Sequence, residues 1–357
     1  MKQSNLTVAS SLLVGGLGIV SAQAVSAQSH KQPDKPNIIL IITDQQTASA
    51  MSCAGNPYVA TPGMDMLAQD GVRFNRSYVT YPLSGPSRAS LMTGRMPVEI
   101  GVKDNGGELA DEYMQNNFGF MASRAGYDCL YAGKWHAPEL VNIPEEGTGF
   151  EKVCNMDDRT LVESCIPHLE KKREKPLFLV ASFLNPHEIC EFARDEALHY
   201  GRLPKADISE CPPLPYNAAI PAYYPEAITL HRRWVPKSYP TELYTDDDWR
   251  RYLYAYYRLV ERVDKEVVRL ITELKKNNLY DNSLILFMSD HGDGVGAHRA
   301  NQKRVLQEEI IRVPFIVKPP HNKTKGVVNE DALISVNLDI YQTISDYTIR
   351  VLRKIRI

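Results

Sequence analysis

The stretch NIILIITDQQ, residues 37–46, decides the fold class of this chain. Positions 38–42 are all aliphatic, and four of the five are isoleucine, before the sequence turns polar at Thr43. An uninterrupted run of β-branched and aliphatic residues is typical of a parallel strand that is buried on both faces. Open α/β sheets bind their ligands at the carboxyl ends of such strands, so Asp44 and Gln45 are candidate site residues. A turn in which the aspartate only closes the strand is the alternative for Asp44.

The same pattern occurs twice more in the chain. Residues 177–183 form an apolar run that leads into Asn185-Pro186-His187, and residues 284–289 form another that ends in Asp290-His291. Between them, residues 247–277 place apolar side chains at alternating steps of three and four, which predicts a long amphipathic helix packed on the core. Strands that alternate with helices indicate an α/β fold, in which a mostly parallel central sheet is sandwiched by helices.

Residues 212–245 are rich in proline, tyrosine and tryptophan and show no clear period. This composition predicts a long ordered loop over the site, which either covers it from solvent or binds substrate. Aromatic side chains of residues 212–257, Trp234 among them, would then be available to stack on sugar rings.

The N-terminus and the charge indicate the compartment and exclude some partners. Lys2 precedes an apolar stretch at residues 8–20, and Ala27 closes a small-residue cleavage motif, so residues 1–27 read as a signal peptide. The stretch is shorter than the roughly 20 apolar residues of a membrane span, which makes stable membrane insertion the weaker alternative. We therefore expect a periplasmic or secreted protein. A formal net charge of -2 argues against a nucleic-acid partner.

The chain has six cysteines, and none of them form a closely spaced metal-binding pair. In an oxidising compartment Cys154 with Cys165, or Cys190 with Cys211, could form disulfides. The sequence does not assign the pairing.

The stretch SGPSR, residues 84–88, carries the chemistry. Pro86 favours the first turn of a helix and Gly94 favours its end, which places Ser84 just before the helix N-terminus. A helix N-terminus attracts anions, and Arg88 lies one turn further on, so the stretch predicts a hydroxyl nucleophile beside an anion site for sulfate or phosphate. Taken alone, the stretch would favour the alternative of a capping serine and a solvent-facing arginine.

Together with its neighbours, this stretch resembles the type I sulfatase family of the alkaline phosphatase superfamily. Ser84-x-Pro86-Ser87-Arg88 with Thr93-Gly94-Arg95 is similar to the family signature, in which the first residue is cysteine or serine. Further matches follow in the family's order across residues 36–317: Pro36-Asn37 through Asp44, Gly126-Tyr127, Gly133-Lys134-Trp135-His136, Asn185-Pro186-His187, Ser289-Asp290-His291-Gly292, Lys303 and Arg312-Val313-Pro314.

The resemblance implies a modified residue at position 84. In the family the first signature residue becomes formylglycine, an aldehyde, and Ser84 is similar to the subset matured by a serine-type radical-SAM maturase. When the aldehyde is hydrated, one hydroxyl attacks sulfur and the other helps to eject sulfate. An unmodified serine lacks this second step.

The resemblance also implies one divalent cation, with Ca2+ expected. Its ligands would be Asp44, Gln45, Asp290, His291 and the modified residue 84. Two of these positions depart from the family pattern. Many relatives have aspartate in place of Gln45, and several have asparagine in place of His291, so both changes lower the charge or the hardness of the site.

The remaining catalytic roles also follow from the resemblance. Lys134 and Lys303 would neutralise sulfate oxygens, His136 would act on the diol proton, and His187 would protonate the departing oxygen. His298 would either contact substrate or cap a loop.

The expected function is a sulfatase, a sulfuric ester hydrolase that releases sulfate from a sulfated substrate such as a glycan. A phosphate or phosphonate ester hydrolase of the same superfamily is one alternative. A truncated, catalytically silent protein is the other, because relatives continue into a smaller C-terminal subdomain. We expect residues 28–345 to form the catalytic domain and residues 346–357 to be an atypical basic tail.

Overall fold

The stretch at residues 37–46 contains the central strand of one sheet. β1 (Asn37–Asp44) is buried along its whole length and pairs in parallel with β5 (Leu177–Pro186) and β6 (Ser283–Ser289). These are the three strands that the sequence predicts, and they are adjacent. The described residues form an eight-stranded sheet of order β4-β3-β5-β1-β6-β7-β2-β8. Its other strands are β2 (Val72–Tyr78), β3 (Asp128–Gly133), β4 (Glu151–Cys154), β7 (Phe315–Lys318) and β8 (Val327–Ser335).

Alternate side chains of the strands face two different layers of helices. Ile39 and Ile41 pack in one hydrophobic core, whereas Ile38, Leu40 and Ile42 pack in the other. Successive side chains of a strand point to opposite faces, so an unbroken apolar run fills both cores at once. The predicted α/β sandwich is therefore confirmed.

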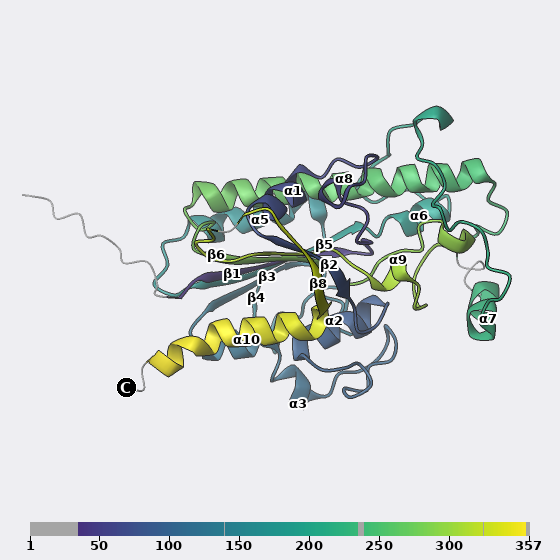
Figure 1. Ribbon diagram of the computed structural model, residues 1–357. Coiled ribbons are helices and arrows are strands. Elements are labelled where there is room, and N and C mark those ends of the chain that lie inside the picture. The colour runs from purple at the N-terminus through teal and green to yellow at the C-terminus, as the bar shows by residue number, and fades with distance from the viewer. Residues whose placement is uncertain (1–34, 139, 235–238, 324, 355–357) are drawn as a thin grey trace, which may run out of the picture. The chain divides into compact units, whose positions relative to one another are not determined.

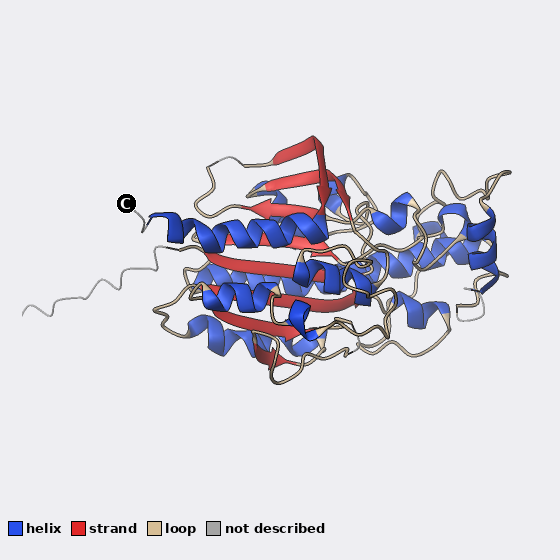
Figure 2. Ribbon diagram, turned by 90° about the horizontal axis from the view of Figure 1, so that it is seen from below, coloured by secondary structure: helices blue, strands red, loops and turns tan. Residues whose placement is uncertain are grey.

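The helices divide between the two faces, as Figure 1 shows. One face carries α1 (Pro62–Gln69), α5 (Asp158–Glu170), α6 (Ile189–Ala193) and α8 (Asp246–Lys276). The other carries α2 (Ser84–Thr93), α4 (Phe118–Arg124) and α10 (Val336–Lys354). Figure 2 shows α10 lying over the strands on this second face. The short helices are α3 (Asp111–Met114) and α9 (Glu308–Ile311), with 3-10 turns at Ser52–Ala54, Ile208–Glu210 and Ala297–Arg299.

The predicted long helix is α8, displaced by one residue from the expected range 247–277. Thr245 and Asp248 form a reciprocal capping box at its start, which satisfies two backbone donors. Acidic residues fill its first turn, and Lys275 and Lys276 lie in its last turn, as the helix dipole favours. Its apolar stripe is buried against the sheet, so the helix is a packing element.

One feature of the mostly parallel sheet was not specified by the sequence analysis, and one segment differs from its expectation. After β6 the chain turns back at the carboxyl end of that strand, so β7 runs antiparallel to β6. The segment at residues 212–245 is not all loop, because α7 (Glu226–Trp234) lies within it. This helix ends in basic residues, which the helix dipole favours, and the surrounding prolines hid its short apolar period.

All six cysteines are free, so neither of the two disulfides considered is formed. The thiol of Cys190 faces the amides of Gln45 and Gln302, whereas that of Cys211 faces the carbonyl of Asp207. Cys165 is packed inside the core. The side chains therefore point to different partners.

The computed structural model describes residues 35–354 except 139, 235–238 and 324, and the side chains at 234 and 349–354 also lie outside the description. The expected signal peptide at 1–27 and the side chain of Trp234 are thus not described. α10 continues without a break past position 346, where the sequence analysis expects an atypical tail. Among the described helices, none is long and apolar enough to cross a membrane.

Candidate active site

Four neighbouring parallel strands bring the predicted site residues to one edge of the sheet. β3, β5, β1 and β6 lie side by side, so their carboxyl ends coincide. Asp44 ends β1, Lys134 follows β3, His187 follows β5, and Asp290 follows β6. The connection at Gly133 requires glycine, because its φ is 94° and a Cβ there would lie 2.1 Å from the carbonyl oxygen of Ser182.

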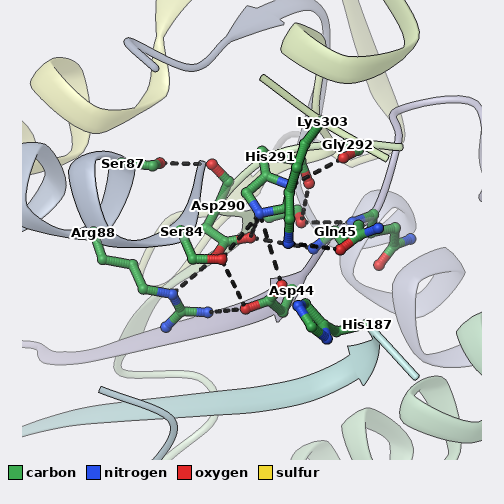
Figure 3. A network of polar contacts seen from close by, with 12 residues as sticks. Asp44, Gln45, Ser84, Ser87, Arg88, His187, Asp290, His291, Gly292 and Lys303 are labelled. Carbon is green, nitrogen blue, oxygen red and sulfur yellow. Dashed lines mark hydrogen bonds and ion pairs between the residues drawn. The ribbon is translucent and has the colours of Figure 1, made fainter. Parts of the chain in front are cut away.

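Ser84 lies where these strand ends meet the start of α2. Its Oγ is 3.0 Å from Nε2 of His291 and 3.5 Å from Oδ2 of Asp44, and the residue is 1% exposed (Figure 3). The sequence analysis places Ser84 just before a helix, but in the structure Ser84 is the first residue of α2. Leu83 takes the capping position instead, because its extended backbone turns the chain into the helix.

The first backbone donors of α2 are largely engaged. The N–H of Gly85 donates to the side-chain oxygen of Asn105 at 2.9 Å, Pro86 has no N–H, and the N–H of Ser87 donates to the carbonyl of Leu83 at 2.9 Å. The predicted anion attraction by the helix N-terminus is therefore weak here. Cationic side chains must supply most of it.

Arg88 holds the carboxylates together. Its Nε donates to Asp290 at 2.8 Å and a terminal nitrogen donates to Asp44 at 3.1 Å, while the other terminal nitrogen donates to Ser182 Oγ at 2.8 Å and to the carbonyl of Lys134 at 3.0 Å. The residue is 1% exposed. Burial alone would lower its pKa, but the two carboxylates outweigh burial and raise it. The sequence analysis expects a fork that grips the anion, whereas these donors are committed to protein acceptors.

Three side chains could hold a metal ion. One ligand atom each from Asp44, Asp290 and His291 lies within 4.8 Å of the others, and all three residues are fully buried. Oδ1 of Asp44 is buried without a hydrogen-bond partner among the described residues. Such an orphaned carboxylate oxygen is costly unless a cation or water completes it.

The imidazole of His291 is arranged as a ligand. Its Nδ1 lies 2.9 Å from the carbonyl of Gly292, which fixes the proton on Nδ1 and leaves the Nε2 lone pair facing the carboxylates. Burial lowers its pKa to about 4, so the ring is neutral at neutral pH. Two carboxylates and a neutral imidazole fit a divalent cation.

Gln45 is turned away from this cluster. Its backbone has a φ of 69°, its Nε2 donates to Asp293 at 2.8 Å, and its Oε1 accepts from Lys303 at 2.8 Å. The amide oxygen that the sequence analysis expects to bind the cation faces the ammonium of Lys303 in this structure, so its ligation stays a prediction. Gln45 instead positions Lys303.

Asp293 anchors this arrangement, and the sequence analysis did not select it. Its carboxylate accepts from Gln45, from the hydroxyl of Tyr252, and from the backbone N–H groups of Val295 and Gln302. Burial raises its pKa, although these hydrogen bonds oppose that shift. Its place three residues after Asp290 was the one available signal.

Other supporting residues have no local signature in the sequence. Asn337, at the start of α10, donates to the carbonyl of Ser87 at 2.8 Å, and Ser87 Oγ donates to the carbonyl of Asp290 at 2.6 Å. These bonds tie α2 to the end of β6. They join residues up to 250 positions apart, which no short motif reveals.

Lys134 and the two predicted histidines also lie at this edge. Nζ of Lys134 is 2.6 Å from Asp44, and burial lowers its pKa against the attraction of that carboxylate. Burial, followed by Lys134 and Arg88, lowers the pKa of His136 to about 4. Burial, followed by Lys303 and Lys134, holds the pKa of His187 well below its usual value. Both rings are therefore neutral, and His136 keeps a buried Nδ1 without a partner in the described chain.

His298 lies outside this group in the contacts that the structure gives. Its backbone N–H donates to Asn217, its carbonyl accepts from Arg232, and its φ is 52°. These backbone contacts match the loop-capping alternative. The site proper thus combines the cations Arg88, Lys134 and Lys303 with the carboxylates Asp44 and Asp290, a balance that suits an anionic substrate.

Known proteins resemble this chain over most of its length. A family model described as Sulfatase matches residues 36–349. Delta 4,5-hexuronate-2-O-sulfatase of Bacteroides thetaiotaomicron is 28% identical over 344 residues, which cover 90% of this chain and 70% of that protein. Ulvan-active sulfatase of Formosa agariphila is 30% identical over 336 residues, 85% of this chain and 60% of that protein. A solved 2-O GAG sulfatase has a TM-score of 0.76 at 27% identity and covers 88% of this chain and 71% of its own.

The chain therefore belongs to the sulfatase family of sulfate-ester hydrolases. It spans 60% of the length of the ulvan-active relative and about 70% of the other two.

Proposed function

We propose that this protein removes sulfate from a sulfated glycan through a formylglycine made from Ser84. The observation that carries the proposal is the position of Ser84 Oγ, 3.0 Å from His291 and 3.5 Å from Asp44. The ammonium of Lys134 lies beside the carboxylate of Asp44, and that of Lys303 lies beside the amide of Gln45. A nucleophile at that point has cations on hand for the charge of a sulfate group.

The modification explains why a serine occupies this position. A two-electron oxidation by a radical-SAM maturase would convert the side chain to an aldehyde. Once hydrated, the aldehyde offers one hydroxyl to attack sulfur with loss of the alcohol, and a second to help expel sulfate.

The chain's own residues have separate tasks in this scheme. A divalent cation, for which we propose Ca2+, would be held by Asp44, Asp290 and His291. A cation there would activate the nucleophilic hydroxyl and bind sulfate oxygens. Arg88 keeps the two carboxylates in register. His136, neutral and partly unpartnered, is suited to accept the diol proton. An anionic substrate beside His187 would raise the pKa of this ring, so that the protonated imidazole could give its proton to the departing oxygen.

The glycan is inferred from the relatives. Three similar proteins are named as sulfatases of hexuronate, ulvan and N-acetylglucosamine. We expect the protein to act in a periplasm or outside the cell, where such polymers are degraded.

Sulfate release tests the proposal. The protein would be co-expressed with a serine-type maturase, supplied with Ca2+, and assayed on sulfated mono- and oligosaccharides and on a phosphate monoester. Ser84→Ala is the inactive variant, and Ser164→Ala, at a half-buried serine on α5, is the matched control. We expect sulfate release by the parent protein and by the Ser164→Ala control, and none by Ser84→Ala. Sulfate release by Ser84→Ala, or by protein whose residue 84 is still serine by mass, would refute the formylglycine mechanism. Preferred turnover of the phosphate ester would favour the alternative hydrolase.

A further inference from the structure

A cavity lies outside the set of site residues described above. It has a volume of about 650 Å³ and is lined by α7, by the start of α8 and by the segment at residues 299–307. Pockets of several hundred cubic ångströms are the size that holds a small organic ligand. None of the proposed metal-binding or catalytic residues lines this cavity.

The walls combine aromatic rings with unsatisfied polar atoms. Tyr224, Tyr244 and Trp249 contribute rings. Nδ2 of Asn301 and Oε1 of Gln307 are buried without hydrogen-bond partners among the described residues, and Asn301 is only 6% exposed. A buried donor and a buried acceptor without partners each cost free energy, unless a ligand or water forms hydrogen bonds with both. Sugar hydroxyls both donate and accept, and their rings pack on aromatic side chains.

The charge of the lining is positive. Arg299 pairs with Asp246 at 2.6 Å, and Arg232 donates to the carbonyls of His298 and Arg299. The exposed Arg233 also lines the cavity and forms no ion pair within the described residues. The lining carries three arginines against the two carboxylates of Glu242 and Asp246, so its formal charge leaves one guanidinium in excess for an anionic group.

The cavity adjoins the sulfate site through one short segment. Asn301 lines the cavity, and Lys303, two residues later, donates to Gln45 in the site. His231 of α7 also lines the cavity and interacts with the backbone of Lys303. A glycan with one sugar at Ser84 would therefore present its neighbouring sugar to this cavity.

We propose that this cavity, between α7, the start of α8 and residues 299–307, binds a second sugar of the glycan that carries an anionic group, with Arg233 as its counter-ion and Asn301 and Gln307 as partners for its hydroxyls. The inference rests on the proposed function, because it takes a glycan as the substrate.

Binding and turnover must be measured separately to test it. Binding is measured by calorimetry on the Ser84→Ala protein with Ca2+, using tetrasaccharides from heparin and from chondroitin sulfate. The same tetrasaccharides with their carboxylates reduced to alcohols are the matched probes. Arg233→Ala removes the free cation, and Asn301→Asp replaces the buried donor with a carboxylate. Arg202→Ala is the matched control, an exposed arginine outside the cavity.

We expect Arg233→Ala and Asn301→Asp to weaken binding of at least one native tetrasaccharide on the order of tenfold, as loss of one charged hydrogen bond does. Carboxyl reduction should weaken it similarly in the parent and have little further effect in Arg233→Ala. Arg202→Ala should bind as the parent does. In the matured enzyme, Arg233→Ala should raise KM for the tetrasaccharide and leave KM for a sulfated monosaccharide unchanged.

The two proposals fail in different ways. Binding that depends on Arg233 in a protein that releases no sulfate would refute the proposed function and keep the cavity as a sugar site. Equal binding of native and reduced tetrasaccharides, no binding of either native probe, or sulfate release with the same KM in Arg233→Ala would each overturn the second site.

Discussion

Replacing Arg88 by lysine separates two roles for this residue. The guanidinium of Arg88 binds Asp290, Asp44 and Ser182 at once, and the site is fully buried. A lysine ammonium is a compact point charge that cannot reproduce this planar fork. It would keep one carboxylate and lose the hydrogen bonds to most of the other acceptors, which include the carbonyl of Lys134.

The size of the effect follows from those contacts. Breaking part of a buried, hydrogen-bonded ion pair costs about 3–5 kcal/mol of unfolding free energy. The loss should lie near the lower limit, because Asp44 keeps Lys134 at 2.6 Å. A chain of 357 residues unfolds with an entropy of about 0.7 kcal/mol per kelvin, so a loss of about 3 kcal/mol should lower the Tm by about 4 °C.

The assay is thermal unfolding with and without Ca2+, together with sulfate release. Arg95→Lys is the control, because Arg95 is exposed just beyond the same helix and rests on the ring of Tyr113. We expect Arg88→Lys to lower the Tm, to weaken the stabilisation by Ca2+ as the carboxylates lose their register, and to lower kcat. An unchanged Tm with a raised KM would refute this reasoning and would mean that Arg88 grips the sulfate directly.

Two further predictions concern the metal and the pH dependence of stability. Chelation of divalent cations should abolish sulfate release and lower the Tm, and added Ca2+ should restore both. The free energy of unfolding should fall by roughly 2.7 kcal/mol if the cation had been present at 100 times its Kd. An unchanged melting curve would contradict a cation at Asp44, Asp290 and His291. Burial raises the pKa of Asp264, which caps α1 through the N–H groups of Gly63 and Met64, to about 6, so between pH 4 and pH 6 the folded chain holds a proton that the unfolded chain releases. Stability should therefore fall as pH rises through this window, by up to about 3 kcal/mol relative to Asp264→Asn in urea titrations, and a parallel pH dependence of the two proteins would contradict it.

Three adjacent strands and the candidate residues that follow them were predictable because their signals are local. A buried parallel strand needs an unbroken apolar run, and the polar residue that follows it marks the ligand edge, as at Asp44 and Asp290. Lys134 and His187 follow two further strands of that edge, which is why the structure brings them together.

Side-chain partners were not predictable in the same way. The donors of Arg88 go to carboxylates, and Gln45 faces Asp293 and Lys303, because residues more than 200 positions apart compete for the same polar atoms. The direction of β7 and the cavity beside α7 likewise depend on tertiary packing. A motif fixes which residues meet and leaves open which atoms they share.

The neighbours of β1 determine when the active site can exist. Its partners β5 and β6 begin about 140 and 245 residues further along the chain, as the hydrogen bonds from the N–H of Leu177 to Asn37 and from the N–H of Gln45 to Asp290 show. During synthesis or export the aliphatic strand must therefore wait, unpaired and prone to aggregation, until nearly the whole sheet has emerged. Because the finished fold leaves Ser84 only 1% exposed, another protein reaches it most easily in that interval. A maturase would have to act before the sheet closes, so the order of folding and modification is set by the topology itself.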